Sequence, residues 1–586
     1  MGLAMASVLV LALLCLLEMA LRSLDYGYPT TFFLEDIDTG KVVENERFVW
    51  QFYNTQSSLK PHPFQFASTK DPDTLRIFVL GESAALGTPE PAFSFSRILD
   101  RMLRHRYPDK QFEVINLAMR GINSHMIRVI AEESIAYDPD LILLYMGNNE
   151  LVGWQAPGPD TKRVPSMGRI RFQQALRSSK LGQWLRSSVS SWRDPEETAQ
   201  DMEFFRQHRL HPDDPRRDQV LDRFRQNLDE ILSAYSEAQI PVLIGTVLAN
   251  ERDFPPLGSL HPAAWEKTSG ASFDQAVAKG EQARQEGNLQ EAVQHFQEAL
   301  QLDPRYAELQ YRLGRLFLQM EDFESAKLHL RAARDCDALP FRAPTACNSV
   351  VSELAKTRGA AGNVTLVDLD QLVRNGASGA AAIPGLEWFY EHVHFRFQGD
   401  YWMASYFYPF IQQALKLPTE APEQESGRLL SLVEAGKQLG YNPVIEGFMI
   451  QSMITLMKQA PYQDRWNHSA MIQAQETQFQ TKYGSMGKAH LAGAIGWTQE
   501  AMKTFPKDWN LPFLAGRSAA RLQDFEQAIE LTTKARDLLP HSTLVRMTMA
   551  QYMMKAGNKN SARQELEHIL KLNPQHGAAR SALNGE

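Results

Sequence analysis

Residues 76–83 read Arg-Ile-Phe-Val-Leu-Gly-Glu-Ser. Four consecutive apolar residues followed by glycine predict a short buried β-strand that ends in a tight turn. Helical stretches at about 93–106 and 124–136 follow, and each leads into another short apolar run. Strands of this kind that alternate with helices predict an α/β fold with a parallel sheet covered on both faces. The four further predicted strands are residues 112–116, 140–146, 240–246 and 364–368.

The composition is that of an ordinary globular protein. Of the 586 residues, 44% are hydrophobic and 22% are charged, which excludes a wholly disordered chain. The net charge of -8 argues against a nucleic-acid partner. Three cysteines cannot build a dense disulfide scaffold, and their spacing shows no zinc-ligand pattern.

The N-terminus predicts a membrane anchor. Leu3 to Leu21 is a run of 19 residues with one charge, Glu18, and a helix of this length would just cross a bilayer. A cleaved signal peptide needs a basic start and a small-x-small site, and neither is present. A buried core helix is the remaining alternative. We expect an uncleaved signal anchor within residues 1–25.

A repeat of 34 residues interrupts the sheet pattern and recurs at the C-terminus. This period, with small residues at fixed positions and a closing proline, is typical of tetratricopeptide repeats. Such repeats predict protein partners. The positions that repeat are Gly280 and Gly314, Ala292 and Ala326, Ala299 and Ala333, then Ala494, Ala528 and Ala562, and Pro506, Pro540 and Pro574.

These patterns divide the chain into seven parts. The sheet domain is split by an insert of repeats, and a second set of repeats follows it as an α-solenoid that we expect to be removable with modest effect on the sheet domain. The predicted parts are the anchor at 1–25, an entry segment at 26–75 with extended runs such as 47–53, the sheet domain at 76–271 and 338–417, the repeat insert at 272–337, a helical bridge at 418–474 and the C-terminal repeats at 475–586.

Polar residues follow three of the predicted strands. Ser83 comes directly after the first strand, Gly121 follows the second and Asn149 follows the third. Because ligands of open α/β sheets bind at the carboxyl ends of the strands, we expect these residues to meet. The backbone N–H groups of Ser83 and Gly121 and the Asn149 amide would then form an oxyanion hole. Taken singly, each has a structural alternative, as a helix N-cap, a turn glycine or an Asx turn.

A histidine pair follows the last strand. Residues 391–395 read Glu-His-Val-His-Phe. Glu391, three residues before His394, could face that ring across one turn and orient it, whereas His392 has Phe389 at the same offset. We therefore expect His394 to be the general base and Glu391 its acid. A surface histidine pair at a helix start is the alternative.

These residues resemble the SGNH/GDSL hydrolases, whose blocks carry Ser, Gly, Asn and an Asp-x-x-His pair in this chain order. Here the blocks are Ser83, Gly121, Asn149 and Glu391-x-x-His394, within residues 74–415 outside the insert. The chain is most similar to membrane-anchored bacterial members with tetratricopeptide repeats. Glutamate replaces the family's aspartate at 82, 150 and 391, and only the last is a catalytic position.

The resemblance implies a flavodoxin-like sheet and a serine hydrolase that needs no metal or cofactor. Ser83 would attack an ester carbonyl, with His394 as base and Glu391 as its orienting acid. The implied substrate is an ester, such as an acetylated glycan of the cell envelope, and either hydrolysis or acyl transfer fits. The catalytic domain would lie outside the cytoplasm, in the periplasm. The alternative is a repeat scaffold whose sheet domain has lost activity.

Two further features leave alternatives open. Residues 161–193 hold eight Lys or Arg and no Asp or Glu. This stretch could lie on anionic lipid, guide an anionic polymer, or be a solvated helix facing acidic residues such as 201–203. Cys336 and Cys347 could pair across their loop or remain buried thiols.

Overall fold

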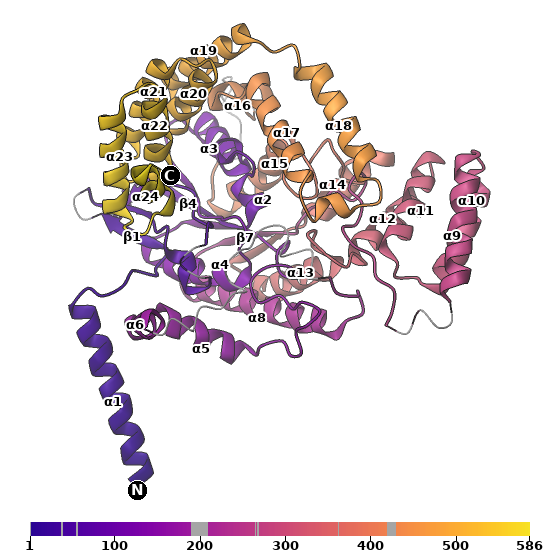
Figure 1. Cartoon of the computed structure of the whole chain (residues 1–586), viewed down its shortest axis with the longest axis horizontal. Helices are drawn as coiled ribbons and strands as arrows, with labels where there is room; N and C mark the ends of the chain where they lie inside the picture. The colour runs from indigo at the N-terminus through magenta and orange to yellow at the C-terminus, as the bar shows by residue number, and fades with distance from the viewer. Residues whose placement is uncertain are drawn as a thin grey trace.

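The computed structural model describes residues 2–36, 39–53, 55, 57–188, 209–263, 265, 269–360, 362–418 and 429–585. The acidic residues 201–203 that we weighed as partners of the basic stretch lie outside these described residues. Within them, the chain forms a parallel sheet domain, a smaller antiparallel sheet and two sets of paired helices (Figure 1).

The central sheet has five parallel strands in the order β5-β4-β6-β7-β8. All five strands predicted from the sequence form. β6 is buried along its whole length, as is the part of β4 from Arg76 to Gly81, because helices cover both faces of the sheet. The strands are β4 (Thr74–Gly81), β5 (Gln111–Asn116), β6 (Leu141–Tyr145), β7 (Val242–Gly245) and β8 (Val364–Val367).

Helices α3 and α15 pack together on one side of this sheet, and α4, α8 and α13 pack on the other (Figure 1). Each helix buries an apolar stripe; in α3 these residues include Ile98, Leu99 and Met102. The covering helices are α3 (Phe95–Arg106), α4 (Ser124–Ser134), α8 (Pro215–Glu237), α13 (Thr345–Gly359) and α15 (Phe397–Ala414).

The entry segment is more ordered than we expected. Three antiparallel strands, β1 (Phe33–Asp36), β2 (Lys41–Glu44) and β3 (Gln65–Ala67), form a second sheet. The run that we predicted to be extended at 47–53 is instead a 3-10 helix, η1 (Phe48–Gln51), with all four residues buried. The aromatic residues of the whole entry segment share one core with the parallel sheet. For example, the rings of Phe66 on β3 and Phe78 on β4 lie 5.5 Å apart. Tertiary packing of these aromatic residues decided the local structure.

The repeat insert forms two helical hairpins between β7 and β8. α9 (Gly270–Gln285) pairs with α10 (Leu289–Leu302), and α11 (Ala307–Gln319) pairs with α12 (Phe323–Asp335). The repeated alanines Ala292 and Ala326 are fully buried, because small residues let paired helices approach closely. α14 (Leu369–Gly376) follows β8.

After α15, the described residues 429–585 are mostly helical. A bridge of three helices leads to six helices that curve over the α3 side of the sheet domain (Figure 1). They are α16 (Leu432–Leu439), α17 (Pro443–Met457), α18 (His468–Tyr483), α19 (Lys488–Thr504), α20 (Asn510–Arg521), α21 (Phe525–Leu538), α22 (Thr543–Lys555), α23 (Lys559–Leu572) and α24 (Gly577–Asn584).

The C-terminal repeats contact the sheet domain through charged side chains, which argues against our expectation that they can be removed with modest effect on that domain. The side chain of Asp508, between α19 and α20, is only 5% exposed and forms ion pairs with Arg97 and Arg101 of α3. Burial opposes ionisation, but the two guanidinium groups outweigh it and lower the pKa of Asp508. Arg517 also pairs with Glu90, near the start of α3. The solenoid is therefore clamped to the sheet domain by buried charge.

We expect Asp508→Ala to lower the free energy of unfolding by about 3 kcal/mol, because Arg97 and Arg101 would both lose an ion pair and the buried Arg101 would keep only its pair with Asp100. Urea unfolding followed by circular dichroism measures this change. The control is Asp537→Ala in α21, which removes an exposed pair with Arg536 and should cost less than about 1 kcal/mol. Equal effects of the two variants would contradict the clamp.

Helix α1 (Gly2–Ser23) extends away from the body (Figure 1). Its segment Met5–Ser23 is long and apolar enough to cross a membrane. Most of its large side chains are exposed, unlike those of a core helix. Near its C-terminal end lies α6 (Lys180–Ser188), which follows α5 (Met167–Ser178), and the two helices carry Arg169, Arg171, Arg177, Lys180 and Arg186 of the basic stretch.

Candidate active site

Ser83 lies at the turn between β4 and the short helix α2 (Ser83–Leu86). Gly81, the last residue of β4, lies very close to the neighbouring strand. A Cβ at this position would be 2.1 Å from the carbonyl oxygen of Tyr145 on β6. Only glycine permits this close approach of the two strands. The chain then turns so that Ser83 is partly exposed while Glu82 and Ala84 are buried.

A chain of hydrogen bonds links the three predicted catalytic residues. His394 Nε2 lies 2.8 Å from Ser83 Oγ, and His394 Nδ1 lies 2.6 Å from Glu391 Oε1. Glu391 is fully buried and His394 nearly so. These distances assign the tautomer: Nδ1–H donates to the carboxylate, which leaves Nε2 free to accept the Ser83 proton.

The segment that carries Glu391 and His394 is a tight reverse turn, not the helix start that we gave as the alternative. Tyr390 N donates to the carbonyl of His394 over 2.9 Å, and a β-bridge joins Phe389 to Phe395. Glu391 Oε1 accepts the backbone N–H of His394 as well as its ring N–H. The longer glutamate side chain thus folds back onto its own turn.

The electrostatic surroundings keep His394 uncharged. Burial, reinforced by the positive charge of Arg120, lowers the pKa of His394 to about 3. A neutral imidazole is the form that a general base requires. The lone pair on Nε2 is therefore available to Ser83 at neutral and mildly acidic pH.

We expect kcat/KM for a small ester to change less than about twofold between pH 7.5 and 5.5. A base with an ordinary pKa of about 6.5 would lose about tenfold at pH 5.5, whereas the lowered pKa of His394 keeps it unprotonated there. Initial rates on p-nitrophenyl acetate across this range measure the profile. A tenfold fall centred near pH 6.5 would contradict it.

The predicted oxyanion donors lie at the same edge of the sheet, but the Asn149 side chain also makes a hydrogen bond within the protein. Gly121 adopts φ +68°, which favours glycine. Asn149 Nδ2 donates to the carbonyl of Ile122 over 2.8 Å, so one of its two N–H bonds is occupied in this structure. The second N–H of that amide remains for a ligand. Both residues are partly exposed, as donors to a substrate must be.

Glu82 and Glu150 have structural roles beside these donors. The Glu82 carboxylate accepts the backbone N–H groups of Asn148 and Asn149 at 2.8 and 3.1 Å. Burial, together with the nearby Glu150, raises the pKa of Glu82 to about 8. Glu150 accepts the N–H and the hydroxyl of Ser124 and so fixes the start of α4. The two glutamates join the turns after β4, β5 and β6.

Asn250, which sequence reasoning missed, holds the histidine turn from β7. Its Nδ2 donates to the carbonyl of Glu391 and its backbone N–H to that of His392, both over 2.8 Å. Arg342 Nη1 in turn donates to the carbonyl of Asn250. Asn250 follows the fourth predicted strand, so its place after a strand end was the available signal.

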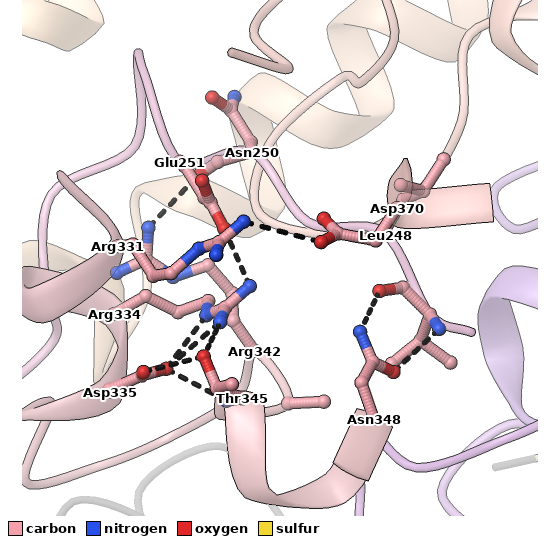
Figure 2. Close-up of polar contacts among 12 residues, drawn as sticks. Leu248, Asn250, Glu251, Arg331, Arg334, Asp335, Arg342, Thr345, Asn348 and Asp370 are labelled. Carbon is pink, nitrogen blue, oxygen red and sulfur yellow. Dashed lines mark hydrogen bonds and ion pairs between the residues drawn. The ribbon is translucent and has the colours of Figure 1, made fainter. Parts of the chain in front are cut away.

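The next residue, Glu251, ties this turn to the repeat insert. Its buried carboxylate pairs with Arg334 of α12 (Figure 2) and also with Arg374 of α14. Burial opposes ionisation of Glu251, but the two arginines outweigh it and lower its pKa to about 2. Asp335, also on α12, accepts from Thr345 at the start of α13. The insert is therefore fastened to the sheet beside the histidine turn.

His392 packs inside the same turn. Its ring lies among Phe254, Phe341 and Tyr462, and its Nδ1 contacts Glu391. Donor atoms of Glu391, His392 and His394 lie within 4.8 Å of one another, close enough to hold a metal ion. Both ring nitrogens of His394 are already hydrogen-bonded, so a cation there would displace Ser83 or Glu391.

Cys336 and Cys347 do not form a disulfide; both are buried free thiols. Burial raises the pKa of each thiol, so neither is poised as a nucleophile.

Comparison with known proteins supports the repeats. A model of the tetratricopeptide repeat family matches residues 283–340 and 519–584, which confirms the repeats predicted in the insert and at the C-terminus. Such repeats point to a protein-interaction scaffold. No curated protein matches the chain.

Several solved structures of repeat proteins are weakly similar. A thermophilic TPR protein in Thermus thermophilus, TTC0263, is 13% identical, with 53% of this chain and 97% of that chain covered and a TM-score of 0.17. MamA 41-end from Desulfovibrio magneticus RS-1 is 10% identical, with 53% of this chain and 99% of that chain covered and a TM-score of 0.16. The TPR2AB domain of yeast Sti1, in complex with pHSP90, is 13% identical, with 54% of this chain and 95% of that chain covered and a TM-score of 0.15. Scores this low support no statement about function.

Proposed function

We propose that the protein is a membrane-anchored serine ester hydrolase of the SGNH type whose tetratricopeptide repeats recruit protein partners. The observation that carries the enzymatic part is the hydrogen-bonded chain from Ser83 through His394 to Glu391. The strand order β5-β4-β6-β7-β8, which is the second, first, third, fourth and fifth strand along the chain, is that of flavodoxin-like sheets and supports the same resemblance.

In the proposed reaction, Ser83 Oγ attacks the ester carbonyl carbon while its proton passes to His394 Nε2. The carbonyl oxygen becomes an oxyanion, for which the Ser83 and Gly121 N–H groups and the Asn149 amide are the donors. His394 then gives its proton to the leaving alcohol, which leaves an acyl group on Ser83. Water, deprotonated by His394, releases the acid and restores the serine.

The substrate class rests on the resemblance and on the anchor. An acetyl ester on a cell-envelope glycan is the proposed substrate, with the catalytic domain on the periplasmic side of the membrane. If a second sugar hydroxyl replaces water in the final step, the same residues perform acyl transfer. Helix α1 supplies the proposed single-pass anchor.

A second candidate function is a repeat scaffold whose sheet domain is inactive. The family match to residues 283–340 and 519–584 favours it, since it concerns the repeats alone. The two candidates differ in one property, the nucleophilicity of Ser83.

A fluorophosphonate probe separates them, because it forms a covalent bond to an activated serine with loss of fluoride. We expect the full-length protein to be labelled once, with the added mass on the tryptic peptide that contains Ser83. If the folded protein carries no label on Ser83, the hydrolase proposal fails and the scaffold function is the candidate that remains.

A further inference from the structure

Helix α5 presents an apolar and basic outer face. Phe172 is 70% exposed and Leu176 37% exposed, and with Arg169 they follow the three- and four-residue spacing of one helix face. The opposite face holds the helix in place: Ile170 is buried, and Arg171 pairs with Glu230 of α8. The outward direction of the aromatic and leucine side chains is therefore fixed by packing on the inner side.

Helix α6 packs against α5 and is joined to the proposed anchor. Trp184 is 39% exposed, whereas the adjacent Gln183 is buried and accepts from the backbone of Tyr28. Glu18 of α1 accepts the N–H groups of Lys180 and Leu181 at 3.1 and 2.7 Å. The start of α6 is thereby held against the last turns of α1.

The arrangement fixes how this face would meet a bilayer. Figure 1 shows α5 and α6 on the side of the body from which α1 departs. Glu18 lies near the C-terminal end of the apolar segment Met5–Ser23, so its contact with α6 sets that helix at the level where the segment would leave the hydrocarbon.

The charge of the surface matches anionic headgroups. Lys162, Arg163 and Arg169 are exposed, and the sequence from 161 to 193 contains no Asp or Glu. Exposed aromatic and aliphatic residues beside basic residues are the composition of helices that lie in a membrane interface.

We propose that the outer face of α5 and α6, defined by Lys162, Arg163, Arg169, Phe172, Leu176 and Trp184, rests on anionic lipid headgroups. The proposal relies on insertion of α1 but not on the hydrolase activity. With this face on the headgroups, the body of the protein lies against the membrane surface, next to the point where the chain leaves the bilayer after α1.

The test places an environment-sensitive fluorophore at Phe172→Cys in the full-length protein, with Cys15 replaced by serine. Cys336 and Cys347 are buried and should not be labelled. The protein is reconstituted into vesicles of phosphatidylcholine, with and without phosphatidylglycerol, that contain a lipid spin-labelled near its headgroup. The matched control carries the label at Leu328→Cys, which is 66% exposed on α12 of the insert.

We expect the label at 172 to shift to shorter wavelength and to be quenched in the anionic vesicles, and the label at 328 to do neither. In 1 M salt the quenching should fall, because the Debye length is then only about 3 Å. Replacing Arg163 and Arg169 by glutamine should reduce it toward the level in pure phosphatidylcholine.

Two results would overturn the proposal. The first is no quenching at 172 in the anionic vesicles. The second is equal quenching with and without anionic lipid and at high salt. A label on the native Cys15 reports insertion of α1 separately, so failure of the anchor is distinguished from failure of this surface.

Discussion

Replacing Ser83 by alanine should lower kcat on p-nitrophenyl acetate by about 10⁴- to 10⁶-fold, the range seen when a triad member is removed. The Ser83 hydroxyl is the group from which His394 Nε2 would take a proton, and alanine has no atom that can form the acyl intermediate. Stability should change little, since Ser83 is partly exposed at a turn. Steady-state kinetics and a thermal melt measure the two effects.

The control for this variant is Ser349→Ala. Ser349 is an exposed serine of α13, and its hydroxyl bonds only to the backbone of its own helix in the described contacts. This variant should keep wild-type kcat and fluorophosphonate labelling. If Ser83→Ala retains wild-type kcat while remaining folded, Ser83 is not the nucleophile.

Replacing His394 by alanine should cost about 10⁴-fold or more in kcat, because its Nε2 is the proposed proton acceptor and its Nδ1–H is the link to the orienting Glu391. Loss of the ring leaves Ser83 without a base and the buried Glu391 carboxylate without its ring partner. Single-turnover measurement of acyl-enzyme formation locates the defect in the first step. A parallel thermal melt shows how much of the loss comes from destabilisation.

His392 provides the matched comparison. We choose His392→Phe because phenylalanine keeps the aromatic packing against Phe254 and Tyr462. The variant loses the contact of Nδ1 with Glu391, yet His394 still holds that carboxylate, so we expect a loss of at most about tenfold. A larger loss in His392→Phe than in His394→Ala would move the base by two residues.

The sequence was informative wherever the signal was local. Apolar runs bounded by helices predicted all five parallel strands, since a strand buried on both faces must be apolar along its length. The 34-residue spacing predicted the repeats, because each helical hairpin needs small residues at the same positions. Polar residues placed after strand ends singled out Ser83, Gly121 and Asn149.

Other features depend on residues far apart in the chain. The entry segment was predicted to be extended at 47–53, but its aromatic side chains pack on the parallel sheet and fold as a 3-10 helix. The pair of Asp508 with Arg101 joins residues 407 apart and cannot be read from either neighbourhood. Glu82 and Asn250 likewise gain their roles from backbone groups of other turns.

The sequence by itself thus determined the strands, the repeats and the identity of the residues proposed for catalysis. Only the tertiary structure decided that His394 lies between Ser83 and Glu391, that the two cysteines stay unpaired and that the solenoid is clamped to the sheet domain. The physical reason is the distance along the chain over which each kind of interaction acts. Backbone preference and hydrophobic period act over a few residues, whereas buried hydrogen bonds and ion pairs form wherever folding brings their partners together.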